Sequence, residues 1–83
     1  LAARAELGLC YALQGQYEPA AAELRAAYEL EPSAPAICYH LGRCLAALGQ
    51  TGEAETFLRR AEWLDPAQAA QARQLWPARP EGR

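Results

Sequence analysis

The sequence carries one pattern twice, as ELGLCYALQGQYEPAAAELRAAYELEP at residues 6–32 and as HLGRCLAALGQTGEAETFLRRAEWLDP at residues 40–66. Laying residues 1–32 over residues 35–66 shows the same amino acid at thirteen positions, each pair lying 34 residues apart. Self-similarity at a fixed period of this length is typical of a repeat protein. The matching pairs are Ala2/Ala36, Leu7/Leu41, Gly8/Gly42, Cys10/Cys44, Ala12/Ala46, Gly15/Gly49, Gln16/Gln50, Ala20/Ala54, Leu24/Leu58, Arg25/Arg59, Ala27/Ala61, Leu30/Leu64 and Pro32/Pro66.

Glycine and proline divide each copy into two helices. Gly8 and its counterpart fall inside the first helix, where a missing side chain lets two helices cross closely. Gly15 and its counterpart follow that helix and can take the positive φ that ends it, while Pro32 and its counterpart stop the second helix. The sequence therefore predicts helices at about 1–14, 18–30, 36–48, 52–64 and 67–76.

The composition agrees with an all-α fold. The chain has 20 alanines among its 83 residues and no valine. Alanine is the best helix former, whereas β-branched residues are the ones enriched in strands. We expect no sheet.

The offsets of the shared residues resemble the tetratricopeptide repeat (TPR) family. The family pattern of Trp, Leu-Gly, Tyr, Ala, Phe, Ala and Pro is matched at most positions, although Arg4 and Cys38 stand at the Trp position and Leu45 replaces the second Tyr. The resemblance implies helical hairpins stacked as an α-solenoid, a right-handed superhelix with a C-terminal capping helix. We therefore expect TPR repeats at residues 1–34 and 35–66, a capping helix at 67–76 and a flexible tail at 77–83.

The expected last helix, Ala67–Trp76, is short and rich in alanine. Asp65 precedes it as a possible N-cap. Its apolar residues would cover the open end of the second repeat; these are Ala69, Ala70, Ala72 and Leu75. Two repeats are fewer than the three or more usually needed for stability, so we expect the upstream end to meet another repeat or a second copy of the chain.

A helical wheel divides the first helix of each repeat into two faces. Offsets 4, 7, 8 and 11 share one arc, which we expect in the core, and offsets 2, 5, 9, 12 and 13 share the opposite arc. In TPR proteins the second arc looks into a concave groove. The groove residues predicted in this way are Ala5, Leu9, Ala12, Leu13, Tyr39, Arg43 and Ala46.

This predicted groove is shallow and mainly apolar. It suits an extended peptide with aliphatic side chains, in which Arg43 would bind a carbonyl or carboxylate. The alternative is that Leu9 and Leu13 merely pack against an upstream element. The Lys and Asn of chaperone-tail receptors are absent at offsets 5 and 9.

Other functional classes lack their signals. A formal charge of −2 with scattered arginines argues against nucleic acid as the ligand. No apolar run is long enough to span a membrane, and the sequence contains neither a catalytic triad nor a phosphate-binding glycine loop. We expect a non-catalytic protein without a cofactor.

The cysteines and the single histidine have structural interpretations. Three cysteines without a CxxC motif are typical of buried free thiols in a reducing cytoplasm, so we expect Cys10 and Cys44 to act as small apolar residues. His40 and Cys44 lie four residues apart, but Cys38 points away from them, which disfavours a metal site. We expect His40 at the surface or the rim of the groove.

Several further residues resemble the class II type III secretion chaperones, which guard translocator proteins before export in bacteria. The matching residues are Leu7-Gly8, Cys10, Gly15-Gln16-Tyr17, Pro35, His40, Cys44-Leu45, Gly49 and Glu53-Ala54-Glu55. That resemblance implies a cytoplasmic, often dimeric protein that binds a hydrophobic translocator segment in its groove. The alternatives are a structural or oligomerisation segment and an accessory TPR region of a larger protein.

Overall fold

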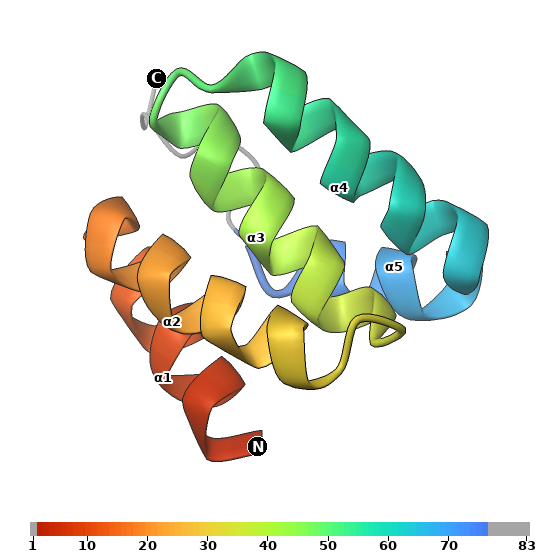
Figure 1. Ribbon diagram of the computed structural model, residues 1–83, viewed down its shortest axis with the longest axis horizontal. Helices are drawn as coiled ribbons and strands as arrows, with labels where there is room; N and C mark the ends of the chain where they lie inside the picture. Colours follow the sequence, from red (N-terminus) through yellow and green to blue (C-terminus); the bar gives the residue numbers. More distant parts are fainter. Residues whose placement is uncertain (1, 77–83) are drawn as a thin grey trace.

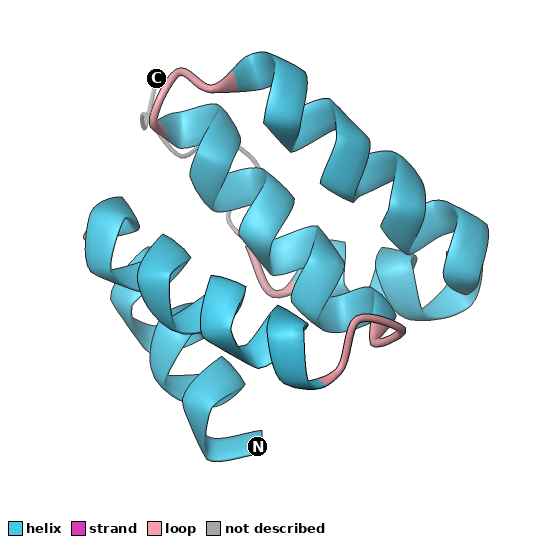
Figure 2. Cartoon of the chain, viewed as in Figure 1, coloured by secondary structure: helices cyan, strands magenta, loops and turns pink. Residues whose placement is uncertain are grey.

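The structure is all-α and contains five helices within its described part. The computed structural model describes the backbone of residues 2–76 and the side chains of residues 5–76. The helices are α1 (Ala2–Leu13), α2 (Tyr17–Leu30), α3 (Pro35–Ala47), α4 (Thr51–Leu64) and α5 (Pro66–Gln74). Figure 2 shows only helices and short loops over these residues, so the predicted fold class is confirmed. The tail expected at 77–83 lies outside the described residues.

The helices form two hairpins and one additional helix (Figure 1). We call α1–α2 the first hairpin and α3–α4 the second hairpin. Helix α3 packs against α4 of its own hairpin, against α2 of the first hairpin and against α5, with a smaller contact to α1. Helix α3 is therefore the centre of the fold.

The turn inside each hairpin is the one that its glycine predicts. Gly15 has a φ of 84° and Gly49 a φ of 87°, in the left-handed region that glycine enters without steric cost. In the first turn the Gln16 amide donates to the Tyr11 carbonyl at 2.9 Å and the Gly15 amide to the Ala12 carbonyl at 2.9 Å. The second turn repeats both bonds. This pair of bonds is a Schellman motif, which satisfies the free carbonyls at a helix end.

The mid-helix glycines mark the close crossing of the two helices in each hairpin. A Cβ on Gly8 would lie 2.7 Å from Leu24 Cγ and 3.2 Å from the Ala20 carbonyl oxygen. A Cβ on Gly42 would meet the α4 side chain of Leu58 at 2.8 Å. The predicted reason for these glycines is confirmed, because any larger residue would push the helices apart.

Helix α5 begins one residue before its predicted start and ends two residues before its predicted end. Asp65 Oδ1 accepts hydrogen bonds from the amides of Ala67 at 3.0 Å and Gln68 at 3.2 Å, which makes Asp65 the N-cap. Pro66 is the first residue of α5, a position where its missing N–H costs nothing. The helix ends at Gln74 instead of Trp76. As a result Leu75 is exposed, contrary to the prediction that it packs inward, and Trp76 is buried in its place.

The core is densest around α3. The largest side chains that are almost completely buried are Leu24 on α2 and four residues on α3. The four on α3 are Cys38, Leu41, Cys44 and Leu45. The expectation that offset 7 lies in the core is confirmed for Leu41, which is 0% exposed, and is wrong for Leu7, which is 44% exposed. Helix α3 contacts α2, α4 and α5, whereas α1 contacts only α2 and α3 among the described helices. The cover over Leu41 therefore has no equivalent over Leu7.

Candidate functional site

The predicted groove residues lie on two helices that contact each other, α1 and α3. Leu13 is 50% exposed and Ala46 is exposed, so both have surface for a ligand. Ala12 and Tyr39 are buried in the core cluster and offer little surface. The remaining residues are partly buried; these are Ala5, Leu9 and Arg43. The set is therefore not a uniform open channel.

Arg43 is held between two aromatic rings. Its Nη1 donates to the hydroxyl oxygen of Tyr39 at 2.9 Å. Its guanidinium carbon lies 5.8 Å from the centre of the Tyr39 ring and 5.0 Å from the centre of the Trp76 ring. Both distances are those of cation–π contacts. Arg43 thus already has partners within the chain, which limits the carboxylate-binding role expected for it.

His40 is buried, contrary to the prediction of a surface or rim position. It is 5% exposed, and its Nδ1 accepts a hydrogen bond from Trp76 Nε1 at 2.9 Å. Burial lowers the pKa of His40 to about 4, because the charged form loses its water. The imidazole is therefore neutral at neutral pH, with its proton on Nε2, which leaves Nδ1 free to accept. The hydrogen-bond partner of His40, Trp76, lies 36 residues further along the chain, so the local sequence around His40 does not indicate it.

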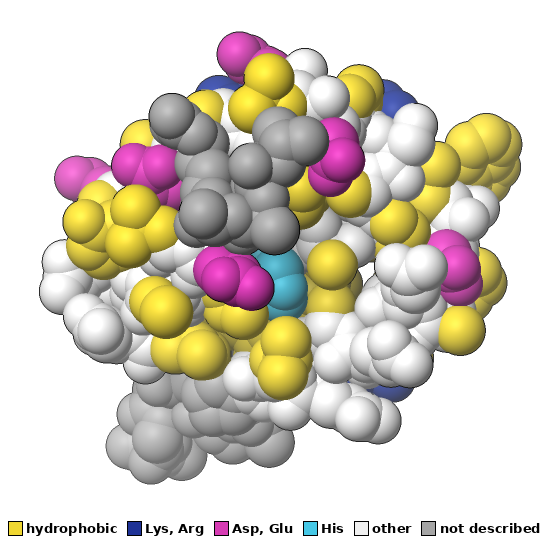
Figure 3. All heavy atoms as spheres, turned by 90° about the horizontal axis from the view of Figure 1, so that it is seen from below, with side chains coloured by type: hydrophobic (Ala, Val, Ile, Leu, Met, Phe, Trp, Pro, Cys, Tyr) yellow, Lys and Arg dark blue, Asp and Glu magenta, His cyan; other side chains and the backbone are white. Residues whose placement is uncertain are grey.

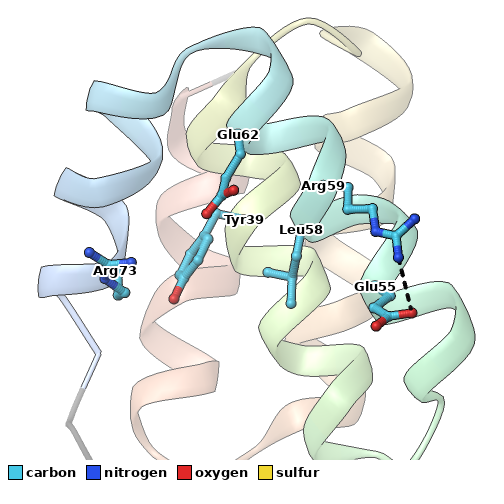
Figure 4. A pocket seen from close by; sticks show the side chains of 6 residues that line it. All are labelled: Tyr39, Glu55, Leu58, Arg59, Glu62 and Arg73. Atoms are coloured by element: carbon cyan, nitrogen blue, oxygen red, sulfur yellow. Dashed lines mark ion pairs between the residues drawn. The ribbon is translucent and has the colours of Figure 1, made fainter.

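A hollow of about 340 Å³ lies where α3, α4 and α5 meet (Figure 4). Tyr39 and Leu58 contribute apolar surface to it, and four charged side chains line the rest; these are Glu55, Arg59, Glu62 and Arg73. Figure 4 shows Arg73 on one side and the Glu55–Arg59 pair on the other, with Tyr39 and Leu58 between them. Of the predicted groove residues, Tyr39 lines this hollow.

The charged side chains around the hollow make only weak ion pairs or none with the described residues. Arg59 Nη2 lies 3.9 Å from Glu55 Oε1, and both side chains are largely exposed, so this ion pair contributes at most about 0.5 kcal/mol. Arg73 is exposed, and its side chain makes no ion pair with the described residues. A ligand carboxylate can therefore reach Arg73 without breaking an existing ion pair.

Large apolar side chains are exposed at separate places on the surface. Helix α1 exposes Leu7 and Leu13, and Trp63 on α4 is 82% exposed. Trp63 lines a second hollow of about 340 Å³ with Thr56, Arg59 and Arg60. On the face seen from below in Figure 3, hydrophobic side chains form several groups interrupted by acidic ones. These groups are candidates for contacts with another protein chain.

The three thiols differ in their surroundings. Cys38 and Cys44 are buried, and burial raises the pKa of both thiols, that of Cys44 to about 12 despite the nearby Arg43. Cys10 is exposed, so the expectation that it acts as a buried apolar residue is wrong. Raised pKa values suppress the reactive thiolate, which makes Cys38 and Cys44 inert.

Within residues 2–76, no group of three or more His, Cys, Asp or Glu side chains could hold a metal ion. None of the described helices has both the length and the apolar character that crossing a membrane requires.

Comparison with known proteins gives one match. The family model described as tetratricopeptide repeat matches residues 11–76, which include α2 to α5 and the end of α1. No curated protein and no solved structure gave a significant match.

Proposed function

We propose that this chain, which belongs to the tetratricopeptide repeat family, is a non-catalytic module that binds an extended segment of another protein. Repeats of this family generally mediate protein–protein interactions. The observation that carries the proposal is the hollow between α3, α4 and α5, where apolar surface and accessible charges lie side by side. We take residues 1–34 and 35–66 as the two repeats, residues 67–76 as the cap and residues 77–83 as a tail.

The chemistry of the hollow defines the partner segment. The Tyr39 ring and Leu58 suit an aliphatic side chain, and Arg73 suits a carboxylate, since a guanidinium binds carboxylates with two parallel hydrogen bonds. Glu62 and Glu55 lie on the same rim and would repel a segment with several acidic groups. We therefore propose an extended segment with aliphatic side chains and a single acidic group. Ala5, Leu9, Leu13, Arg43 and Ala46 remain proposed contacts for the rest of the segment, whereas the buried Ala12 is not one of them.

A finer proposal concerns the identity of this partner. The spacing of Leu7-Gly8, Cys10, His40 and Cys44 resembles class II type III secretion chaperones. On that basis the partner would be a hydrophobic secreted translocator, bound in the bacterial cytoplasm before export. The support for this proposal is the sequence resemblance alone.

Arg73 provides the test of the proposed function. The probe is a fluorescein-labelled peptide of alternating leucine and proline with one central glutamate, titrated by fluorescence anisotropy. Arg73→Gln removes one positive charge from the hollow and should weaken binding about fivefold, the size of one exposed charge-assisted contact. Gln71→Glu is the matched control, because Gln71 is exposed on the same helix and the net charge changes equally. Equal binding by the two variants would refute the hollow as the binding site.

A second candidate function is self-association through α1. Leu7 and Leu13 are about half exposed and Cys10 is exposed on the same helix, whereas Leu41 and Cys44 at the equivalent positions are covered. A homodimer would cover this surface in the same way. Light scattering over a range of concentrations should show a dimer that Leu7→Gln weakens. A strict monomer at the highest concentration would exclude this function.

A further inference from the structure

Trp76 is held mainly by its side chain. It lies beyond the end of α5 at Gln74 and is only 7% exposed. Its backbone amide makes a local bond to the Arg73 carbonyl at 3.1 Å, and the Leu75 amide makes another to the Ala72 carbonyl at 3.1 Å. Within the described residues, these two bonds join the backbone of residues 75–76 to the preceding turn of its own helix. Among the described residues, release of the Trp76 side chain would require movement of residues 75–76.

The polar and cationic groups that bind the indole ring all come from α3. The indole N–H donates to His40 Nδ1 at 2.9 Å, and the Arg43 guanidinium carbon lies 5.0 Å from the indole centre. Tyr39 holds Arg43 from the other side through its hydroxyl oxygen at 2.9 Å. Helix α3 is itself packed by α2 and α4, so this arrangement does not depend on Trp76 for its backbone. The three side chains form a specific site for a flat ring with an N–H donor.

Stacking of the repeats does not account for this set of residues. The positions of Tyr39, His40 and Arg43 lie 34 residues after Ala5, Glu6 and Leu9 in the first repeat. None of those three residues is aromatic or cationic, although α1 makes the same hairpin contact with α2 that α3 makes with α4. A hairpin of this fold can therefore form without an indole site. The site is an addition to the second repeat.

We infer that Tyr39, His40 and Arg43 form a binding site for a tryptophan side chain, which the chain fills with its own Trp76 and which a partner's tryptophan fills when residues 75–76 swing out. The site requires the neutral imidazole, because a protonated one cannot accept the indole N–H. Among the described residues, Tyr39 of α3 and Trp76 beyond α5 contact His40, and Arg43 lies on the Trp76 ring.

This site adjoins the hollow of the proposed function. Tyr39 belongs to both, since its ring lines the hollow and its hydroxyl accepts from Arg43. A segment that lies against Arg73 and Leu58 can therefore extend past Tyr39 to the indole site. The inference rests on the proposed function for the partner segment, whereas the affinity of the site for an indole ring does not depend on the hollow. Trp76 would then compete with the partner's tryptophan for the site and lower the apparent affinity of the chain for the partner.

The displacement of Trp76 can be followed by its own fluorescence. Trp63→Phe leaves Trp76 as the single tryptophan, and the change is tolerable because Trp63 is largely exposed. The probe is the leucine–proline–glutamate peptide extended by 4-fluorotryptophan, which emits almost no fluorescence, and the control peptide carries phenylalanine instead. Binding of the probe should shift the Trp76 emission to longer wavelength and raise its quenching by acrylamide severalfold, whereas the control peptide should not. A Trp76 that stays shielded while the probe is bound in the hollow would overturn the inference and leave the proposed function intact.

A second measurement tests the site without the hollow. Trp76→Ala opens the site, and free indole should then raise the melting temperature of this variant but not that of the wild-type chain. Benzothiophene has the same shape without the N–H and should stabilise the variant less, because His40 Nδ1 stays unpaired. A folded Trp76→Ala variant with equal response to both compounds would refute a specific indole site. Should this variant not fold, the fluorescence experiment decides alone. Indole binding with no binding of the peptide would instead refute the proposed function and support this site.

Discussion

Residues 1–32 and 35–66 share thirteen residues at equivalent positions, yet several of the matching pairs differ in their surroundings. Leu7 is 44% exposed and Leu41 is 0% exposed; Cys10 is exposed and Cys44 is buried. Local sequence is not the cause, since both hairpins have the same turns and the same close glycine crossing. The cause is the number of neighbouring helices. Helix α3 packs against α2, α4 and α5, whereas α1 contacts only α2 and α3 among the described helices. Burial in a repeat protein thus follows from position in the stack.

At other equivalent positions the residue of the first hairpin is the more deeply buried one. Ala12 is 2% exposed, whereas its equivalent Ala46 is exposed; Leu24 is fully buried, whereas Leu58 is only partly buried. The first hairpin packs against α3 of the second hairpin, whereas the described element that follows the second hairpin is the short helix α5. Leu58 borders the hollow for this reason. The candidate site is therefore a consequence of the short α5.

The largest expected effect is the difference in stability loss between alanine substitutions at Leu41 and at Leu7. Leu41→Ala should destabilise the chain by about 2 to 5 kcal/mol, because it leaves a cavity in the core. Leu7→Ala should cost less than about 1 kcal/mol, because Leu7 is half exposed. Urea unfolding followed by circular dichroism measures both. Equal losses would mean that the two helices have the same surroundings in solution, as in a dimer that covers α1.

The next effect is an acid sensitivity specific to the second hairpin. The pKa of His40 falls from an ordinary 6.5 to about 4 in the folded chain, so between these values the unfolded chain binds more protons. Stability is then complete above pH 6.5 and falls as the pH drops towards 4. Between pH 7 and pH 5 the loss should be about 2 kcal/mol. Urea unfolding at both pH values measures it.

His40→Asn is the control for this prediction. Its side-chain carbonyl can still accept from the Trp76 N–H, but it does not titrate. The loss between pH 7 and pH 5 should nearly vanish in this variant. A variant that loses as much stability as the wild type would show that other groups cause the acid effect.

A smaller effect distinguishes the two glycine crossings. Gly8→Ala should cost about 1 to 3 kcal/mol, because the new methyl group meets Leu24, which is fully buried and tightly surrounded. Gly42→Ala should also destabilise the chain, since its Cβ would lie 3.1 Å from the Ala54 carbonyl oxygen, but by less, because Leu58 is partly exposed and can turn away. Thermal unfolding of the two variants gives the comparison. A larger loss for Gly42→Ala would show that Leu58 is held as firmly as Leu24.

The sequence predicted the parts of the fold that depend on neighbouring residues. The glycine turns, the Asp65 cap and the start of each helix follow from local backbone chemistry, and all were confirmed within one or two residues. The wheel also identified the face of α3 that carries Tyr39 and Arg43. Local rules were sufficient for these features because they involve residues within one turn or one repeat.

The environment of individual side chains was less predictable. His40 was expected at the surface, but its partner Trp76 lies 36 residues away and comes from a segment that was expected to continue α5. The wheel assigns Leu7 to the core, and Cys10 was expected to pack as a small apolar residue, but no described helix covers either of them. A periodic pattern shows which face can be buried and not whether another element is there to bury it.

The reactivity of the thiols tests the central comparison most directly. The chain at low micromolar concentration is treated with iodoacetamide at neutral pH, and the modified cysteines are located by peptide mass mapping. Cys10 should react at least about 100-fold faster than Cys44, because Cys44 is buried and its raised pKa suppresses the thiolate. All three cysteines should react in urea. Similar rates for Cys10 and Cys44 in the folded chain would contradict the different surroundings of the two hairpins.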